Sequence, residues 1–207
     1  MPILSIIIPI KEDEKEHLQL LDSLDNISTN NIEIISSKGN GRAVSLNSGA
    51  KKSSGEHLLF LHADSKVTPT IIDDLLKNIK EKTDSLLFFD LAFYDSKSLL
   101  MKLTESGANF RSHIFKSPYG DQGLCIKREL FDKIGGYDED VEYGEDHLFV
   151  WKARQNNIEI TPINSKLYTS ARKYKKNGWF KTTLLHQYLW IKQAYPEWIK
   201  LKRTRNQ

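Results

Sequence analysis

The chain has 207 residues, of which 39% are hydrophobic and 28% are charged. This composition excludes a disordered chain, and no run reaches the roughly 18 apolar residues that a membrane-spanning helix needs. A single cysteine, Cys125, excludes a disulfide framework and a cysteine-rich zinc site, so a reducing, cytoplasmic setting is the default expectation. The first apolar run ends abruptly in charged residues, which predicts a strand and not a signal peptide.

The net charge of +3 is unevenly distributed along the chain. Residues 1–165 contain 19 Lys and Arg against 26 Asp and Glu, whereas residues 166–207 contain 11 against Glu197 alone. A basic tail of this kind indicates a polyanionic partner, such as a phosphate-bearing substrate, nucleic acid or an anionic membrane surface. Alternatively, the tail packs on the acidic body and neutralises it.

The first half of the chain alternates strand and helix signals. Strands are predicted at 4–8, 32–35, 57–61 and 86–93, with helices at 14–24, 41–53 and 68–79 between them. The strands are hydrophobic throughout instead of alternating, which predicts an α/β fold with a mainly parallel sheet covered on both faces. Ligands of such sheets bind at the carboxyl ends of the strands, so the residues that follow each strand are the candidates for function.

The second half is predicted to be more helical. Helices are expected at 98–115, 128–134, 145–156 and 179–202, with strands at 124–126, 158–163 and 167–170. We expect Gly135-Gly136 to end the second of these helices and Pro196 to break the last one. The basic stretch Arg172–Lys176 is expected on a mobile connection near the active edge of the sheet.

Asp64 follows the third predicted strand, at the edge where ligands are expected. A carboxylate there suits a hard divalent cation, which prefers oxygen ligands, and His62 lies on the same side of the extended segment. The alternative is that Asp64 only caps the segment that follows.

Glu145-Asp146 is a carboxylate pair at the start of a predicted helix. Negative charge there is stabilised by the helix dipole and by free N–H groups, so a capping pair is one interpretation. The other is a general base, because an acceptor hydroxyl needs a carboxylate to take its proton.

Three loop segments carry weaker signals. Asp121-Gln122 lies between glycines and has polar groups suited to sugar hydroxyls, or forms a simple turn. Arg172–Lys176 could bind a diphosphate, or be a solvated charged face. Gly39–Arg42 is similar to a dinucleotide-binding fingerprint, but Val44 stands where the third glycine belongs.

The order of the motifs is more specific than any one of them. The chain contains, in sequence, SIIIPI at 5–10, GRAVSLNSGA at 41–50, LLFLHADS at 58–65, PYGDQG at 118–123, YGED at 143–146 and TSARKYKKNG at 169–178. Together these segments resemble the family 2 glycosyltransferases of GT-A fold, and among them a compact, soluble bacterial subgroup. The resemblance covers nearly the whole chain as one GT-A domain.

The resemblance implies a nucleotide-diphosphate sugar donor, inversion at the anomeric carbon and a divalent metal, Mn²⁺ or Mg²⁺. It places a nucleotide-binding half at 1–95, an acceptor and catalytic half at 96–178 and C-terminal helices at 179–207. Matched by motif, the site residues are Asp64 for the metal and donor, Asp146 with Glu145 for the catalytic base, Asp121 and Gln122 for the acceptor, and Pro9, Arg42 and Arg172 for the donor nucleotide and its diphosphate.

One segment departs from the family pattern. Members usually follow the second strand with an Asp and a Ser/Thr-Asp-Gly run that binds the base and ribose, whereas here Ser36 or Ser37 stands in the place of that carboxylate. Lys11–Glu14 likewise replaces the usual Asn-Glu-Glu. The alternative is therefore that the protein is a non-catalytic member of the family, which binds a glycan or a nucleotide.

The resemblance also implies which partners the protein has. The acceptor is expected to be a glycan or a lipid-linked sugar, and the basic residues 179–207 give a possible peripheral membrane contact. A nucleotidyltransferase is disfavoured because Pro9–Glu12 is not a glycine-rich basic loop, and nucleic-acid binding is not expected because no reading module is present.

Overall fold

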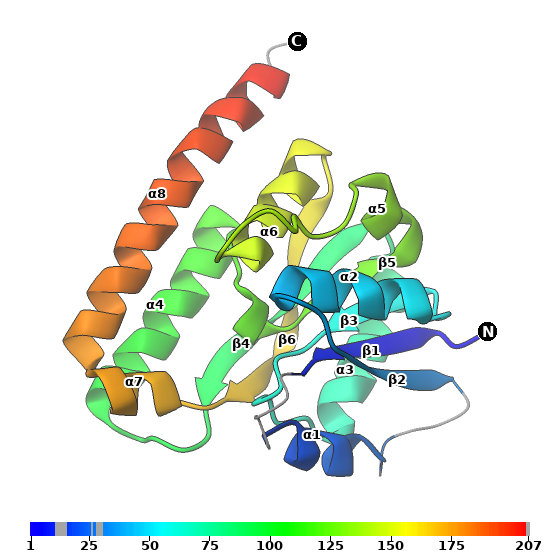
Figure 1. Cartoon of the computed structure of the whole chain (residues 1–207), viewed down its shortest axis with the longest axis horizontal. Coiled ribbons are helices and arrows are strands. Elements are labelled where there is room, and N and C mark those ends of the chain that lie inside the picture. Colours follow the sequence, from blue (N-terminus) through cyan, green and yellow to red (C-terminus); the bar gives the residue numbers. More distant parts are fainter. Residues whose placement is uncertain (11–15, 26, 28–30, 206–207) are drawn as a thin grey trace.

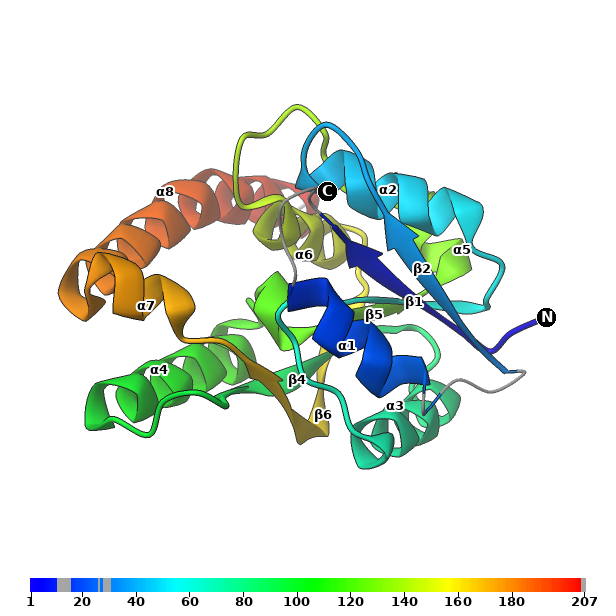
Figure 2. The same ribbon diagram turned by 60° about the horizontal axis from the view of Figure 1, so that its bottom comes forward.

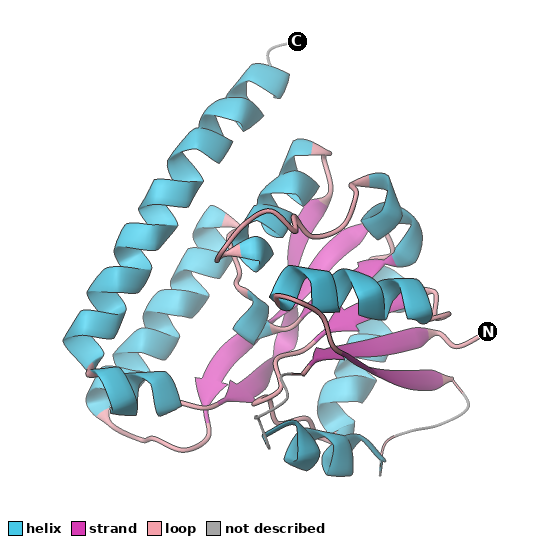
Figure 3. Cartoon of the chain, in the orientation of Figure 1, coloured by secondary structure: helices cyan, strands magenta, loops and turns pink. Residues whose placement is uncertain are grey.

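The computed structural model describes residues 1–10, 16–25, 27 and 31–205. A six-stranded sheet in the order β2-β1-β3-β5-β4-β6 lies between layers of helices (Figures 1 and 3). Its strands are β1 (Leu4–Pro9), β2 (Ile32–Ser37), β3 (His57–Phe60), β4 (Ser85–Phe93), β5 (Leu124–Lys127) and β6 (Glu159–Thr169). The pairings are parallel except that β5 is antiparallel to β3 and β4. The predicted α/β fold with a mainly parallel sheet is confirmed.

Helices cover both faces of the sheet, as Figure 2 shows from a second direction. The apolar side chains of α1 (Glu16–Asp25) and α3 (Pro69–Glu81) pack on one face. Those of α2 (Arg42–Lys52), α5 (Arg128–Lys133) and α6 (Glu145–Gln155) pack on the other. The remaining helices are α4 (Leu99–Phe115), the short 3₁₀ turn η1 (Gly120–Gln122), α7 (Arg172–Asn177) and α8 (Trp179–Arg205).

The hydrophobic pattern explains the central elements. Ile6, Ile7 and Ile8 of β1 have no exposed surface, because both faces of the strand are covered. In α3, Thr68 caps the helix by accepting a hydrogen bond from the Ile71 N–H at 3.4 Å, and Pro69 occupies the first turn. These elements agree with the sequence prediction.

Three predictions for the C-terminal third were wrong. The two strands expected at 158–163 and 167–170 are one strand, β6, whose register against β4 shifts between Phe88 and Asp90, so that the polar residues between them form an irregularity and not a break. The stretch 172–176 is helical and belongs to α7.

Pro196 does not break the last helix either, because α8 continues through it. A proline in a helix removes one backbone hydrogen bond, but the turn that follows is fixed to α6. The side chain of Gln155 donates hydrogen bonds to both the carbonyl and the carboxylate of Glu197, and Leu201 is buried. None of the helices in the described part of the chain is long and apolar enough to cross a membrane.

Candidate functional site

Arg42, the first residue of α2, lies in a cluster of polar side chains at the carboxyl edge of the sheet. Its Nε is 3.2 Å from Oε1 of Glu145, and its Nη2 is 3.9 Å from Oδ2 of Asp146. The same Nη2 contacts Nε2 of His62, which follows β3. Burial, and then the charges of Arg42 and Lys173, hold the pKa of His62 well below its usual value. His62 is therefore neutral and can accept a hydrogen bond from Arg42.

Asp146 connects the start of α6 to the loop before β5. Its Oδ2 accepts a hydrogen bond from the Gly120 N–H at 2.6 Å, and its Oδ1 accepts one from the His147 N–H at 2.8 Å. Gly144, at the N-cap, has a φ of 73° and offers no capping side chain. Glu145 and Asp146 thus supply the negative charge at this helix start, and Asp146 additionally binds a loop 26 residues away in sequence.

Gly120 is required by the close approach of three side chains. A Cβ at this position would lie 2.5 Å from Nη2 of Arg42 and 2.7 Å from both Oδ2 of Asp146 and Nε2 of His62. Real Cβ atoms essentially never come within 3.0 Å of such neighbours. The sequence motif PYGDQG marks the loop, but the need for glycine here is visible only once α2, α6 and β3 are brought together.

Asp64 lies after β3 at the same edge and fits a cation that a diphosphate brings with it. Thr169, at the end of β6, donates a hydrogen bond to Oδ1 of Asp64 at 3.4 Å. Burial raises the pKa of Asp64, while Lys173 and Arg42 oppose that rise. Among the residues that the structure describes, no group of three or more His, Cys, Asp or Glu side chains could hold a metal. One carboxylate plus diphosphate oxygens and water is an ordinary ligand set for Mg²⁺, whereas a metal centre built from protein ligands alone does not fit.

Asp121 offers a buried, unsatisfied oxygen next to this cluster. Its Oδ1 is buried and has no hydrogen-bond partner among the described residues. Burial raises the pKa of Asp121, Arg111 lowers it, and Asp146 raises it further. Arg111 also stacks on Tyr119, with the guanidinium carbon 3.7 Å from the ring centroid. A bound hydroxyl could satisfy the free oxygen of Asp121, since buried polar groups are normally hydrogen-bonded.

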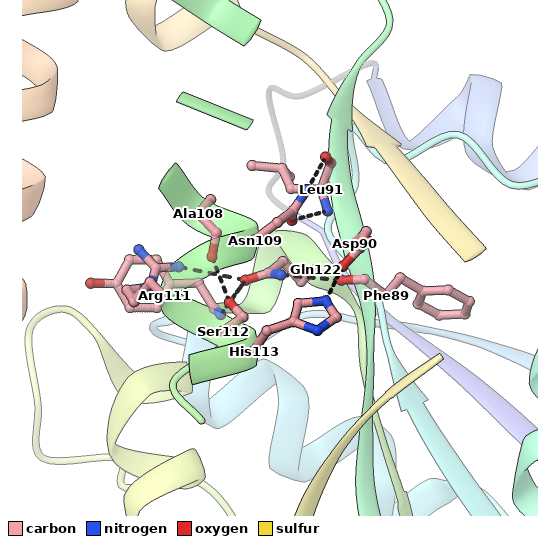
Figure 4. A network of polar contacts seen from close by, with 10 residues as sticks. Phe89, Asp90, Leu91, Ala108, Asn109, Arg111, Ser112, His113 and Gln122 are labelled. Atoms are coloured by element: carbon pink, nitrogen blue, oxygen red, sulfur yellow. Dashed lines mark hydrogen bonds and ion pairs between the residues drawn. The ribbon is translucent and has the colours of Figure 1, made fainter. Parts of the chain in front are cut away.

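Gln122 lies inside the protein, with no exposed surface. Its Oε1 accepts a hydrogen bond from Ser112 Oγ at 2.6 Å, and its Nε2 donates one to the Phe89 carbonyl at 3.1 Å (Figure 4). Its Oε1 also accepts a hydrogen bond from the Tyr119 N–H at 3.2 Å. These bonds attach the loop to α4 and β4. Gln122 therefore shapes the loop, and the acceptor contact that the resemblance implies would require this network to open.

Helix α7 brings Lys173, one of the cations of the stretch Arg172–Lys176 that the sequence points to, next to the cluster. Its charge acts on the three groups His62, Asp64 and Asp121. Arg172 lies on a different side, where it lines a hollow of about 580 Å³ together with Gln19, Tyr94, Asp95, Ser170, Lys175 and Lys176. Neighbouring residues of a helix point in different directions. Which cation reaches the cluster therefore depends on the orientation of α7, which sequence does not specify.

The ends of β1 and β2 form the part of this edge where the resemblance places the donor nucleotide. Pro9 lies opposite Ser37 in the parallel pairing. The side chain of Ser37 is buried against α2. A Cβ added to Gly49 of that helix would lie 3.2 Å from the Cβ of Ser37. Ser36 is exposed, so it is the one of the two serines that a nucleotide base can reach. The altered segment 11–14 lies outside the described residues.

Comparison with known proteins identifies the family. Residues 12–137 match the family model described as Glycosyl transferase family 2. A curated relative, the uncharacterized glycosyltransferase YwdF of Bacillus subtilis (strain 168), is 24% identical over 137 residues, which are 63% of this chain and 51% of that protein. The chain thus spans about half the length of this relative.

Solved structures share the fold at low sequence identity. S. aureus TarS 1-349 in complex with UDP-GlcNAc has a TM-score of 0.62 and 18% identity, over 82% of this chain and 58% of that one. The mannosyltransferase PcManGT from Pyrobaculum calidifontis, in complex with GDP-Man and Mn²⁺, has a TM-score of 0.62 and 15% identity, over 82% and 57%. Because the family model spans more than half of the chain, and the fold agrees with it, the chain belongs to glycosyl transferase family 2.

Proposed function

We propose that the protein is an inverting glycosyltransferase that moves a sugar from a nucleotide-diphosphate sugar to an acceptor hydroxyl, with a divalent cation and with Asp146 as general base. The observation that carries this proposal is the meeting of Asp146, Arg42 and His62 at Gly120, beside Asp64. A proton acceptor and a cation ligand thus share one edge of the sheet. Family membership supports the same reaction class.

Asp146 is the group proposed to take the proton. The N–H groups of Gly120 and His147 orient its carboxylate, and they leave further lone pairs on both oxygens free for an acceptor hydroxyl. As the proton moves to Asp146, the hydroxyl oxygen forms a bond to the anomeric carbon. The bond from that carbon to the diphosphate breaks on the opposite face, and the electron pair leaves with the diphosphate. Because the hydroxyl attacks the face opposite the leaving diphosphate, the configuration at the anomeric carbon is inverted.

The leaving diphosphate is assigned to the cationic side of the site. Asp64 would hold a Mn²⁺ or Mg²⁺ ion, which when bound supplies positive charge to the departing oxygens. Lys173, whose charge acts on Asp64, would bind the phosphate oxygens directly. Arg172, which lines a hollow on another side of the same helix, would reach them only after a change in the orientation of α7. Asp121 is proposed to bind an acceptor hydroxyl through its unsatisfied Oδ1.

The donor is inferred to be a nucleotide sugar, in keeping with the complexes of two structural neighbours with UDP-GlcNAc and with GDP-Man. Base recognition has to differ from the family pattern, because Ser36 offers a hydroxyl where a carboxylate usually accepts base N–H groups. The loop from β2 to α2 is also short, at residues 38–41. This loop favours a second candidate function, a member that binds a nucleotide without catalysis.

Family membership also supports a division of the chain into two functional halves and a tail. Residues 1–95 would bind the donor, residues 96–178 would carry the base and the acceptor loop, and residues 179–207 would form the helical tail of a single GT-A domain. The acceptor would be a glycan or a lipid-linked sugar, with no nucleic acid as partner. A cytoplasmic location suits the single, buried Cys125.

A thermal-shift panel of nucleotide sugars, with and without Mn²⁺, tests the proposal, since a ligand that binds only the folded state raises its apparent stability. We expect one donor to stabilise the protein in a Mn²⁺-dependent way. The same mixture, with candidate acceptors, should then release nucleoside diphosphate. Stabilisation without any release would favour the non-catalytic alternative, and a lack of response to every nucleotide would contradict both.

A further inference from the structure

An apolar surface covers the outer sides of α4 and α8. Seventeen large apolar side chains are exposed among the described residues, and thirteen of them lie on these two helices. On α8 the exposed residues are Phe180, Leu184, Leu185, Tyr188, Ile191, Tyr195 and Trp198. On α4 they are Leu99, Leu100, Leu103, Phe110, Ile114 and Phe115. We call these thirteen residues the α4–α8 face.

The face is continuous across the two helices, which lie side by side at one end of the molecule (Figure 1). Trp179 Nε1 donates a hydrogen bond to Thr104 Oγ1 at 2.9 Å, and the rings of Phe115 and Trp190 are 5.9 Å apart. Between the helices and α6 lies a groove of about 410 Å³, to which the face contributes Ile114, Phe115, Ile191, Tyr195 and Trp198. Exposed residues of both helices therefore meet in one apolar surface.

The spacing shows that the exposure of α8 is systematic. Phe180, Leu184, Tyr188, Ile191, Tyr195 and Trp198 follow one another at intervals of three or four residues, which places them on one side of the helix. The opposite side is anchored to the body through Gln193 and Glu197. An apolar patch of this extent on a water-soluble protein marks an interaction surface.

The charged residues around the α4–α8 face indicate what kind of partner it binds. Lys181, Lys192 and Lys202 are exposed. The spacing of 11 residues sets Lys181 and Lys192 along one flank of the apolar stripe, and Lys202, four residues after Trp198, lies at the C-terminal end of the stripe. The Nζ of Lys202 lies 3.8 Å from the ring centroid of Trp198, so its stem covers the stripe while its charge stays at the edge.

The carboxylates of the two helices are turned inward. Glu105 of α4 accepts a hydrogen bond from the Phe93 N–H at 2.7 Å. Glu197 of α8 accepts hydrogen bonds from Gln155 at 2.8 Å and from Lys200 at 2.6 Å. The face is therefore apolar and cationic, with no free negative charge from either helix. A second copy of the chain would oppose like charges across such a surface, whereas an anionic bilayer complements it.

We propose that the α4–α8 face binds the surface of an anionic phospholipid bilayer, with the apolar stripe among the acyl chains and the lysines at the headgroups. The face also adjoins the acceptor loop, because Ser117 lines the groove and accepts a hydrogen bond from Trp190 Nε1 at 3.2 Å. A bilayer-bound protein would thus present Tyr119 and Asp121 to an acceptor in the membrane. This last step, a lipid-linked acceptor, rests on the glycosyl transfer proposed above, whereas bilayer binding does not.

Co-sedimentation with vesicles tests the face without donor or acceptor. The purified chain should bind vesicles of phosphatidylcholine with about 30% phosphatidylglycerol far better than pure phosphatidylcholine vesicles, and binding should weaken as salt rises. The variant Leu184→Ser/Tyr188→Ser/Ile191→Ser and the variant Lys181→Glu/Lys192→Glu/Lys202→Glu should each bind at least about tenfold more weakly. Because the substituted side chains are exposed, circular dichroism and nucleotide binding should be unchanged, so a failure of bilayer binding is distinguishable from a failure of the proposed function.

Matched controls use exposed residues elsewhere. Leu18→Ser/Tyr168→Ser and Lys51→Glu/Lys77→Glu/Lys80→Glu should bind vesicles as the unaltered chain does. Equal binding to both vesicle types, or unaltered binding by the two α8 variants, would overturn the proposal. It would also be overturned by a concentration-dependent dimer in light scattering that the apolar variant dissociates, with no vesicle binding, since a second copy would then cover the face.

Discussion

The backbone N–H of Gly120 donates a 2.6 Å hydrogen bond to Oδ2 of Asp146, which joins the loop before β5 to the start of α6. The contact fixes the carboxylate where the loop that carries Asp121 passes it. Asp146, whose local sequence also fits a helix cap, is thus held against a second element of the site.

Asp146→Asn tests the proposed base. Asparagine keeps the size of the side chain but cannot take a proton, so turnover should fall by roughly 10²–10⁴-fold. Donor affinity, measured by calorimetry, should stay within about twofold, because the base contacts the acceptor and not the donor. Asp140→Asn, on the exposed loop before α6, is the control. Normal turnover per folded Asp146→Asn molecule would leave Asp146 with a capping role only.

Gly120→Ala tests the close packing of the cluster. The added methyl group would lie 2.5–2.7 Å from three side-chain ends, of Arg42, Asp146 and His62, which have to move. These are flexible ends and not backbone, so the melting temperature should change little while turnover falls at least about tenfold. Gly107→Ala is a matched control, because nothing lies within 4 Å of its Cβ position on α4. That control should be active and slightly more stable, since alanine favours the helix. Full activity of Gly120→Ala would show that the cluster does not need this spacing.

The sequence was sufficient to predict most of the sheet and its helices, because β1 and α3 carry strong apolar patterns. It failed where tertiary contacts override local signals. Pro196 is tolerated because Glu197 is fixed to α6, and the polar residues within β6 are absorbed by a shift of register. In the candidate site, motif order drew attention to Asp64 and Asp146, which the structure places at one edge of the sheet, but it could not show that Gln122 is buried.

Asp64→Asn tests the cation site by stability as well as by activity. A neutral amide is a poor ligand for Mn²⁺ or Mg²⁺, which prefer charged oxygen donors. The Mn²⁺-dependent part of the thermal stabilisation by a nucleoside diphosphate should therefore disappear, while the metal-free protein keeps its fold. The hydrogen bond from Thr169 can be retained by the amide oxygen. If the Mn²⁺ dependence is unchanged, Asp64 is not the ligand.

The cations of α7 can be separated by their effect on phosphate binding. Lys173→Ala should weaken binding of a nucleoside diphosphate by about tenfold, since a charge-assisted hydrogen bond is lost, with little effect on the nucleoside. Arg172→Ala should weaken it less, because Arg172 lines a hollow on another side of α7. The positive charge of Lys173 lowers the pKa of Asp64, so loss of Lys173 should also reduce the effect of Mn²⁺. Lys51→Ala, on α2, is the control. An equal loss for nucleoside and diphosphate would contradict a phosphate role for either residue.

His147, the neighbour of Asp146, should make stability depend on pH. Trp151 Nε1 donates a hydrogen bond to His147 Nε2 at 2.9 Å, and Nδ1 lies 3.2 Å from Gln193 Oε1 of α8, which suits a neutral ring that donates from Nδ1. Burial lowers the pKa of His147 below 6.5, and Arg111 and Arg154 lower it further, against the opposing effects of Gln193 and Asp146. The unfolded chain therefore takes up this proton at a higher pH than the folded chain does. The contribution of His147 to the free energy of unfolding is therefore fully present above pH 6.5. It is lost as the pH falls from 6.5 through the lower pKa that His147 has in the folded chain.

His147→Phe keeps a ring against Tyr119 but removes the titration and leaves the Trp151 N–H without its acceptor. At about pH 7.5 this variant should be less stable than the unaltered chain by about 1–3 kcal/mol in urea unfolding. Between about pH 7.5 and 5.5 it should lose less stability, so the difference between the two proteins narrows in acid. Other buried histidines, such as His62, titrate equally in both proteins and cancel in the comparison. A difference that stays constant over this range would mean that His147 does not change its protonation on unfolding.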